Sequence, residues 1–346
     1  MVAFAVVIAA AYTVPTLPAS AATSSAMSIA PKKNYVIDPG KSVKDKLTIR
    51  NLDRNHPLEL SLRVVDFTFT DDGGTPKLLL DENTPQTTWS LKPFLKVPEG
   101  VTIPAGGSKT LNMSVSIPAG HGAGSYYSAI VYSTGAPGGG NVGLSASGVT
   151  LVFTQIPGKV NEKLTLKNFG AYILPMQTQK PGYVFFTMQK PQGMAYTLQN
   201  DGNVTEAPVG SITIKDIFGN EQKITNVNPT GSLALIGQTR TFTSCIKLQS
   251  QNVDFNGDKS KANNCVEPDL WPGIYTATLD VFYGQNGNMT QEVTGTAMFW
   301  YLPGWFIILV IVVLLVAFFG GRKLWYNLQE KLHGGVRLNK KSSRRR

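Results

Sequence analysis

One polar segment carries oxygen side chains at alternate positions, as the start of a calcium-binding loop does: Asp254, Asn256 and Asp258. The match then ends. Such a loop needs glycine at its sixth position and glutamate at its twelfth, but this chain has Lys259 and Cys265 there. We therefore predict a polar loop, with calcium binding as the alternative, and no metal or organic cofactor.

The cysteine content is limited to Cys245 and Cys265, which flank this segment. In an exported protein such a pair most simply forms a disulfide. Closing a loop of about twenty residues contributes roughly 3 kcal/mol in the chain-entropy model, and it would hold residues 251–264 in place. Two unbonded thiols are the alternative.

Residues for catalysis do not combine into a known motif. The run His121-Gly122-Ala123-Gly124 is similar to the oxyanion loop of lipases, but the nucleophile motif Gly-x-Ser-x-Gly is absent from the sequence. The three histidines, His56, His121 and His333, have no partner at metal-ligand spacing. Because Asp and Glu are scattered, a glycosidase-type carboxylate pair stays open as a remote alternative. We predict that the protein is not an enzyme.

A binding role would use aromatic side chains on rigid strands. The main candidates for contact with a ligand are Trp89, Tyr126 and Tyr127, and Trp271 and Tyr283 are further candidates. The alternative is that these rings pack inside the fold, as aromatic residues in strands usually do.

The net charge of +10 is concentrated at one end of the chain. Residues 322–346 carry nine Lys and Arg against the single acid Glu330, which gives +8 and leaves +2 for the rest. A nucleic-acid partner is therefore not expected.

Both ends of the chain indicate export and membrane anchoring. Residues 1–21 have the apolar core and small-residue site of a signal peptide, although no Lys or Arg precedes that core; an uncleaved helix is the alternative. Residues 303–321, with an apolar run from Trp305 to Phe319, are predicted to span a membrane. Arg322 and Lys323 begin a basic tail, residues 322–346, which places that tail in the cytoplasm and the preceding chain outside.

Between these ends, runs rich in Val, Ile, Thr, Tyr and Phe alternate with turn residues. In residues 58–65 the side chains of Leu58, Leu60, Leu62 and Val64 point one way, which predicts a half-buried antiparallel strand. The fold class is all-β: two tandem immunoglobulin-like β-sandwiches, residues 27–156 and 160–299, followed by a single C-terminal transmembrane helix.

The first sandwich resembles the WxL-interacting type of membrane-anchored bacterial surface protein. The residues that carry the resemblance are the Pro39-Gly40 turn, Ile49-Arg50-Asn51, Trp89, Ile103-Pro104-Ala105-Gly106, and Ile117-Pro118 followed by 124–130. The resemblance implies a cell-surface protein whose first sandwich binds peptidoglycan. We expect a cell-wall glycan or a surface protein as the partner; a structural or adhesive stalk without its own ligand is the alternative.

Overall fold

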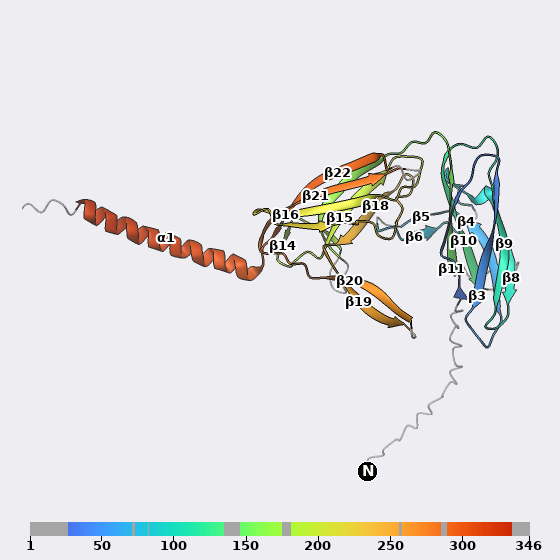
Figure 1. Ribbon diagram of the computed structural model, residues 1–346, viewed down its shortest axis with the longest axis horizontal. Coiled ribbons are helices and arrows are strands. Elements are labelled where there is room, and N and C mark those ends of the chain that lie inside the picture. The colour runs from blue at the N-terminus through green and yellow to red at the C-terminus, as the bar shows by residue number, and fades with distance from the viewer. Residues whose placement is uncertain are drawn as a thin grey trace, which may run out of the picture.

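The computed structural model describes residues 27–70, 73–81, 83–134, 146–174, 181–255, 258–284 and 289–333. The predicted signal peptide and residues 334–346 of the predicted tail lie outside this part of the chain. Two β-sandwiches follow one another, and a long helix leaves the second (Figure 1). This is the all-β class with one apolar helix that the sequence predicts.

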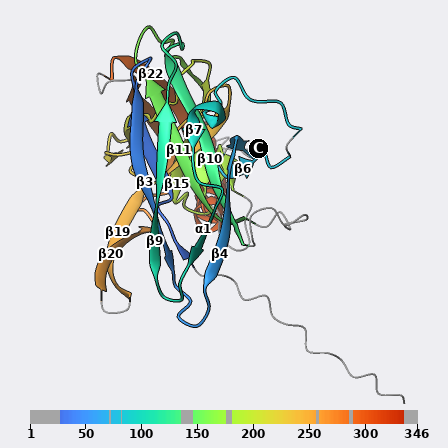
Figure 2. The same cartoon turned by 90° about the vertical axis from the view of Figure 1, so that its right-hand side faces the viewer.

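The first sandwich, which faces the viewer in Figure 2, consists of two main sheets. One sheet has the order β1 (Met27–Ser28), β3 (Ser42–Asn51), β9 (Ser108–Ser116) and β7 (Leu95–Lys96). The other has the order β2 (Lys32–Val36), β11 (Ala146–Ile156), β10 (Gly124–Thr134), β4 (Leu58–Val65) and β8 (Gly100–Ile103). Only β2 and β11 pair in parallel within these sheets. A 3-10 turn, Lys92–Phe94, precedes β7, and β5 (Phe67–Phe69) pairs with β6 (Pro76–Leu78) in a separate hairpin.

The alternation predicted for residues 58–65 is confirmed from Leu58 to Leu62, whereas Val64 is half-buried and Val65 on the opposite face is buried. Leu58, Leu60 and Leu62 are buried on the inner face of β4, whereas Glu59 is exposed between them. They pack against residues from the facing sheet such as Ile49. Period-two burial of this kind is what a strand with one covered face requires.

The second sandwich also has two main sheets. One has the order β13 (Gly182–Val184), β12 (Leu164–Ile173), β15 (Gly193–Asn200) and β18 (Thr239–Cys245). The other has the order β14 (Phe186–Thr187), β22 (Gln291–Tyr301), β21 (Gly273–Tyr283), β16 (Val209–Asp216) and β17 (Glu221–Ile224). Its core contains stacked ring pairs, among them Tyr196 with Phe242 and Tyr275 with Phe299.

The prediction of a polar loop at residues 251–264 is wrong. This segment belongs to an antiparallel hairpin of β19 (Lys247–Phe255) and β20 (Asp258–Val266), which projects from the sandwich in Figure 1. The ladder is described as far as the pair Phe255 and Asp258, and the sequence between them, Asn-Gly, is one that short hairpins favour. Cys245 and Cys265 form a disulfide with 5.4 Å between their Cα atoms, as predicted.

The last described element is the helix α1 (Gly304–His333), and two residues lie between the end of β22 and its start. Its segment Gly304–Gln329 is apolar and long enough to cross a membrane, and no part of its most apolar stretch is buried in the protein. The helix continues past the predicted limit at residue 321, through Arg322 and Lys323. It fits a single-pass membrane anchor.

A shared apolar cluster joins the two sandwiches. Tyr127, Phe153 and Phe67 of the first sandwich pack with Leu235, which lies just before β18 of the second. Polar contacts continue the junction, because Ser125 donates its backbone N–H to the carbonyl of Asn203 at 3.0 Å. Buried apolar contacts and hydrogen bonds therefore fix one sandwich on the other.

Candidate functional site

Trp89 and Tyr127 do not form a surface site. Tyr127 has no exposed area, and its ring stacks on that of Trp89 with 6.0 Å between the centroids. The backbone N–H of Tyr127 also donates to the carbonyl of Trp89 at 2.9 Å. Both residues belong to the cluster between the sandwiches, so their rings pack there and Tyr127 is not accessible to a ligand.

The buried carboxylate of Asp66 holds the segment that carries Trp89. It accepts hydrogen bonds from the hydroxyls of Ser90 at 2.7 Å and Ser128 at 2.9 Å, and from the backbone N–H of Thr87 at 3.2 Å. A buried carboxylate is stable only with such partners. The polar stretch before Trp89 is therefore fixed by this network.

Tyr126 points to the opposite face of β10 from Tyr127, because consecutive residues of a strand alternate. Its ring lies edge-on to His121, with 4.5 Å between the centroids, and its hydroxyl donates to the carbonyl of Gly122 at 3.2 Å. His121 in turn contacts the ring of Phe94. The three main aromatic candidates thus lie in two different places.

Two of the calcium-like residues lie in neighbouring rungs of the β19–β20 hairpin. Asp254 lies on β19 and Asp258 on β20, whereas Asn256 lies outside the described residues. Across the described ranges, no three His, Cys, Asp or Glu side chains are grouped as metal ligands.

A hollow that the sequence does not predict lies on the outer face of the β13-β12-β15-β18 sheet. Its volume is about 560 Å³. The following residues line it: Gly73, Asn168, Tyr172, Pro181, Gly182, Tyr183, Thr197, Thr241 and Thr243. We call it the tyrosine groove. Gly73 comes from the segment between β5 and β6, so both sandwiches contribute to the groove.

Two tyrosines and a row of threonines give the groove its chemistry. The rings of Tyr172 and Tyr183 meet edge-on with 5.1 Å between their centroids. The hydroxyl of Tyr183 lies 2.6 Å from Oγ1 of Thr197, which lies 2.7 Å from Oγ1 of Thr241. The phenol of Tyr183 is thereby held at the sheet surface by a chain of hydroxyls.

Strand register places the two tyrosines of the groove beside each other and next to a glycine. Tyr172 pairs with Tyr183 on one side and with Gly193 on the other, and the outward residue beside it on β12 is Gly170. A Cβ atom at Gly170 would lie 3.7 Å from Cδ1 of Tyr183, so the tyrosine ring passes over a position without a side chain. The absence of a side chain at Gly170 therefore lets the Tyr183 ring lie against the sheet at the edge of the groove.

This combination suits a carbohydrate. Sugar rings have apolar C–H faces that pack on aromatic rings, and hydroxyl groups that bond to hydroxyl and amide side chains. Thr243 and Asn168 are exposed at the groove and can make such bonds. Among the described residues that line it there is no Asp or Glu to act as a general acid or base.

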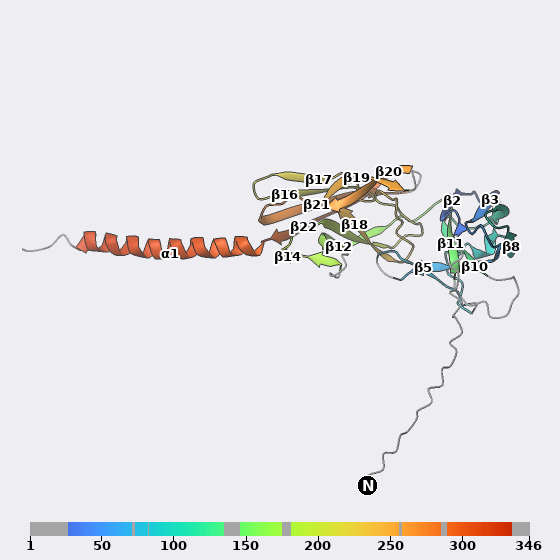
Figure 3. The same ribbon diagram turned by 90° about the horizontal axis from the view of Figure 1, so that it is seen from below.

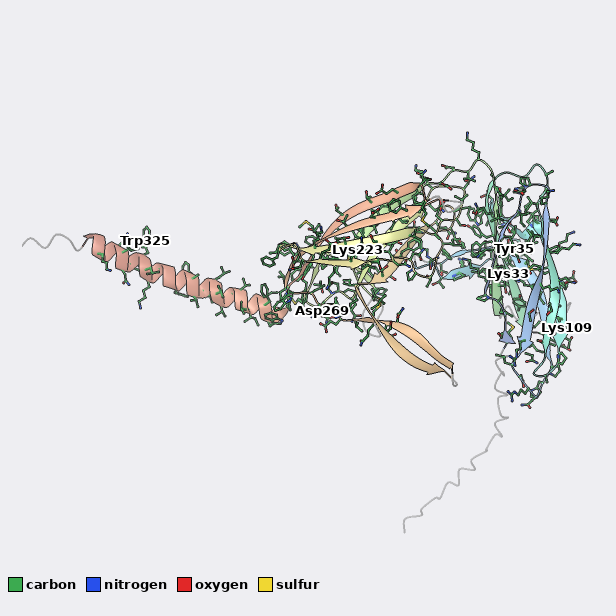
Figure 4. All side chains as sticks on the ribbon, in the orientation of Figure 1. Lys33, Tyr35, Lys109, Lys223, Asp269 and Trp325 are labelled. Carbon is green, nitrogen blue, oxygen red and sulfur yellow. A yellow bond between two sulfur atoms is a disulfide. The ribbon has the colours of Figure 1, made fainter. Side chains whose placement is uncertain are left out.

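A second hollow, of about 500 Å³, lies on the first sandwich beside Lys44, Lys46 and Lys96. Asp45 also lines this hollow, and its carboxylate accepts hydrogen bonds from Lys33 and Tyr35, both labelled in Figure 4. These bonds lower the pKa of the Asp45 carboxyl to about 2. The three exposed lysines make this surface basic, which suits an acidic ligand more than a neutral sugar.

One pattern in the sequence could have indicated part of the tyrosine groove. Thr239, Thr241 and Thr243 alternate with other residues, which places three hydroxyls on one face of a strand. Sequence alone does not show that Tyr172 and Tyr183 lie on the same face, because that depends on which strands are neighbours.

No protein-family model matches the chain, and no curated protein sequence matches it. The resemblance to WxL-interacting proteins therefore rests on the sequence motifs alone.

Among solved structures, the chain is similar to the class 5 fimbriae chaperone CfaA, with 13% identity and a TM-score of 0.34 over 78% of this chain and 98% of that one. It is also similar to the E. coli chaperone DraB, with 13% identity and a TM-score of 0.32 over 80% and 98% of the two chains. For the CupB2 chaperone of Pseudomonas aeruginosa the identity is 9% and the TM-score 0.28, over 76% and 96%. At these TM-scores, none of the similarities bears on what this chain binds.

Proposed function

We propose that the protein is a non-enzymatic surface protein, held by α1 in a membrane, that binds a cell-wall glycan in the tyrosine groove. The groove carries the proposal because it joins two aromatic rings, a threonine row and an exposed amide. Pockets that orient a ligand with a few polar groups on an apolar surface are typical binding sites. In the proposed topology the two sandwiches lie outside the cell and the basic tail lies in the cytoplasm.

Binding of the full-length protein in detergent to insoluble peptidoglycan tests the proposal. We expect saturable retention that changes little with salt, because the described residues lining the groove carry no charge. Tyr172→Ala should weaken retention about tenfold or more, whereas Tyr172→Phe, which keeps the ring, should retain most of it.

The matched control compares two Thr→Ala variants in the two different sheets of the second sandwich. Thr241→Ala removes a hydroxyl of the groove, whereas Thr278→Ala removes an exposed hydroxyl from β21 in the other sheet. Loss with the first variant and not the second supports the groove. Equal retention of all variants would reject it, and retention that disappears at high salt would point to the lysines of the first sandwich. No retention at all would favour the stalk without a glycan ligand.

A further inference from the structure

The end of the second sandwich from which α1 leaves carries exposed apolar side chains. Phe218 is 83% exposed and Trp271 is 79% exposed, and neither belongs to the tyrosine groove or to the junction between the sandwiches. Ile217, Phe185, Phe186 and Met188 are exposed as well. We call these six residues the apolar rim.

Strand register places the rim at the α1 end. β16 ends at Asp216, which pairs with Tyr275 near the start of β21, and β21 starts opposite Tyr301, the last residue of β22. Ile217 and Phe218 follow β16, and Trp271 precedes β21, so these residues lie at the same end of the sheet as Tyr301.

Phe185 and Phe186 of the rim lie beside the end of β22, just before α1 begins. β14 pairs in parallel with the end of β22, Phe186 opposite Trp300. The backbone N–H of Trp300 donates to the carbonyl of Phe185 at 2.7 Å, and that of Leu302 donates to the carbonyl of Thr187 at 3.0 Å. In Figure 3 β22 leads into α1.

The connection between sandwich and helix is very short. Only Leu302 and Pro303 separate β22 from α1, and the three Cα-to-Cα steps from Tyr301 to Gly304 span at most about 11 Å. From Trp305 to Trp325 the helix rises about 30 Å, which is one hydrocarbon thickness, and tryptophan is favoured at both membrane interfaces. The start of α1, including Trp305, therefore lies in the interfacial layer, and the end of the sandwich lies directly over it.

The rim residues are also held firmly at their backbones. The carboxylate of Asp216 accepts from the backbone N–H groups of Phe218 at 2.8 Å and Asn220 at 2.9 Å, which fixes the turn that carries Phe218. The hydroxyl of Tyr275 donates to the carbonyl of Trp271 at 2.7 Å. The nearby acid Asp269, labelled beside the start of α1 in Figure 4, is paired with Lys247.

We infer that the apolar rim rests in the headgroup region of the bilayer that α1 spans, and thereby fixes the orientation of the ectodomain on the membrane. Aromatic side chains are favoured at that depth. The sandwich is joined to α1 by only two residues, so the exposed apolar side chains at this end of it are close to lipid. This inference is independent of the glycan proposal.

Spin labels on the full-length protein in vesicles of phosphatidylcholine and phosphatidylglycerol test the inference. Single cysteines are introduced by Phe218→Cys, Trp271→Cys and, as the control, Gln291→Cys. Gln291 is exposed at the opposite end of β22, whose eleven residues span roughly 33 Å. We expect labels at 218 and 271 to be relaxed more by oxygen, which concentrates in lipid, than by a water-soluble nickel chelate, and the label at 291 to show the reverse.

If the chelate relaxes all three labels equally, the rim is in water and the inference is wrong. Dipolar broadening at 218 or 271 that disappears on dilution with unlabelled protein would also overturn it, because a second copy would then cover the rim. All substituted side chains are exposed, so the variants are expected to fold, and an unchanged thermal transition verifies this.

Discussion

The guanidinium carbon of Arg240, on β18 of the second sandwich, lies 4.9 Å from the centroid of the Phe69 ring, on β5 of the first. The same group lies 5.5 Å from the ring of Phe242 and donates to the carbonyl of Leu233 at 2.8 Å. The backbone N–H of the same Phe69 donates to Oε1 of Gln238, two residues before Arg240, at 3.1 Å. The β5–β6 hairpin is thus fastened to the second sandwich, and Gly73 of its loop is held at the tyrosine groove.

Arg240→Ala should weaken this junction. Loss of two cation–π contacts and of one hydrogen bond is expected to lower the free energy of unfolding by about 1–3 kcal/mol. Arg240→Lys, which keeps the charge without the flat guanidinium, should give an intermediate loss. Urea unfolding measures the change, and Lys223→Ala, at an exposed position on β17, is the control. Equal stability of the Arg240→Ala and Lys223→Ala variants would contradict the expectation.

Gly124→Ala should disturb the other side of the junction. Gly124 has a φ of +147°, and a Cβ atom there would lie 2.8 Å from the backbone oxygen of Asn203 in the second sandwich. Strain and displacement are expected to cost about 1–3 kcal/mol. Gly122→Ala is a close control, because the nearest atom to its Cβ is the Tyr126 hydroxyl at 3.8 Å. Thermal unfolding should separate the two variants; identical transitions would show that the junction adapts freely.

Local pattern was enough to predict the strands that have one covered face. Leu58, Leu60 and Leu62 alternate with polar residues, and this period identifies β4 whatever its neighbours are. The apolar run from Trp305 to Phe319 likewise identified α1, because few soluble folds bury so long an apolar helix.

Features that depend on pairing between distant segments could not be predicted in this way. β10 is buried on both faces, because the second sandwich covers the face of Tyr127, and neither Tyr126 nor Tyr127 shows this in sequence. The β19–β20 hairpin was missed because its composition is polar, although Asn256 and Gly257 were a turn signal. The tyrosine groove requires β12, β13, β15 and β18 to be neighbours.

Removal of the disulfide should loosen the hairpin more than the sandwiches. A cross-link across 20 residues stabilises by about 3 kcal/mol in the chain-entropy model. In Cys245→Ser/Cys265→Ser we therefore expect faster amide exchange in β19 and β20, with exchange in β4 unchanged. Hydrogen exchange followed by mass spectrometry measures both. Unchanged protection of the hairpin would mean that its backbone ladder is sufficient.

Glu206 should make the protein less stable as the pH rises. It is 3% exposed, its Oε2 accepts from the backbone N–H of Gly284 at 3.2 Å, and Oε1 accepts no hydrogen bond among the described residues. Burial, and next the negative charge of Glu162, raise the pKa of Glu206 from 4.5 to about 7. Between these values the unfolded chain has released its proton and the folded chain has not, so stability falls from about pH 4.5 to about pH 7 and then stays level.

A shift of this size corresponds to a loss on the order of 3 kcal/mol, at 1.36 kcal/mol per pKa unit. Glu206→Gln cannot ionise, so its stability relative to the wild type should increase across this interval and be constant above it. Glu162→Gln removes the neighbouring charge and should reduce the slope of the wild-type profile without abolishing it, because burial is the larger cause. Urea unfolding at a series of pH values measures the three profiles. Parallel profiles for the wild type and Glu206→Gln would show that this carboxyl ionises in the folded protein as it does in water.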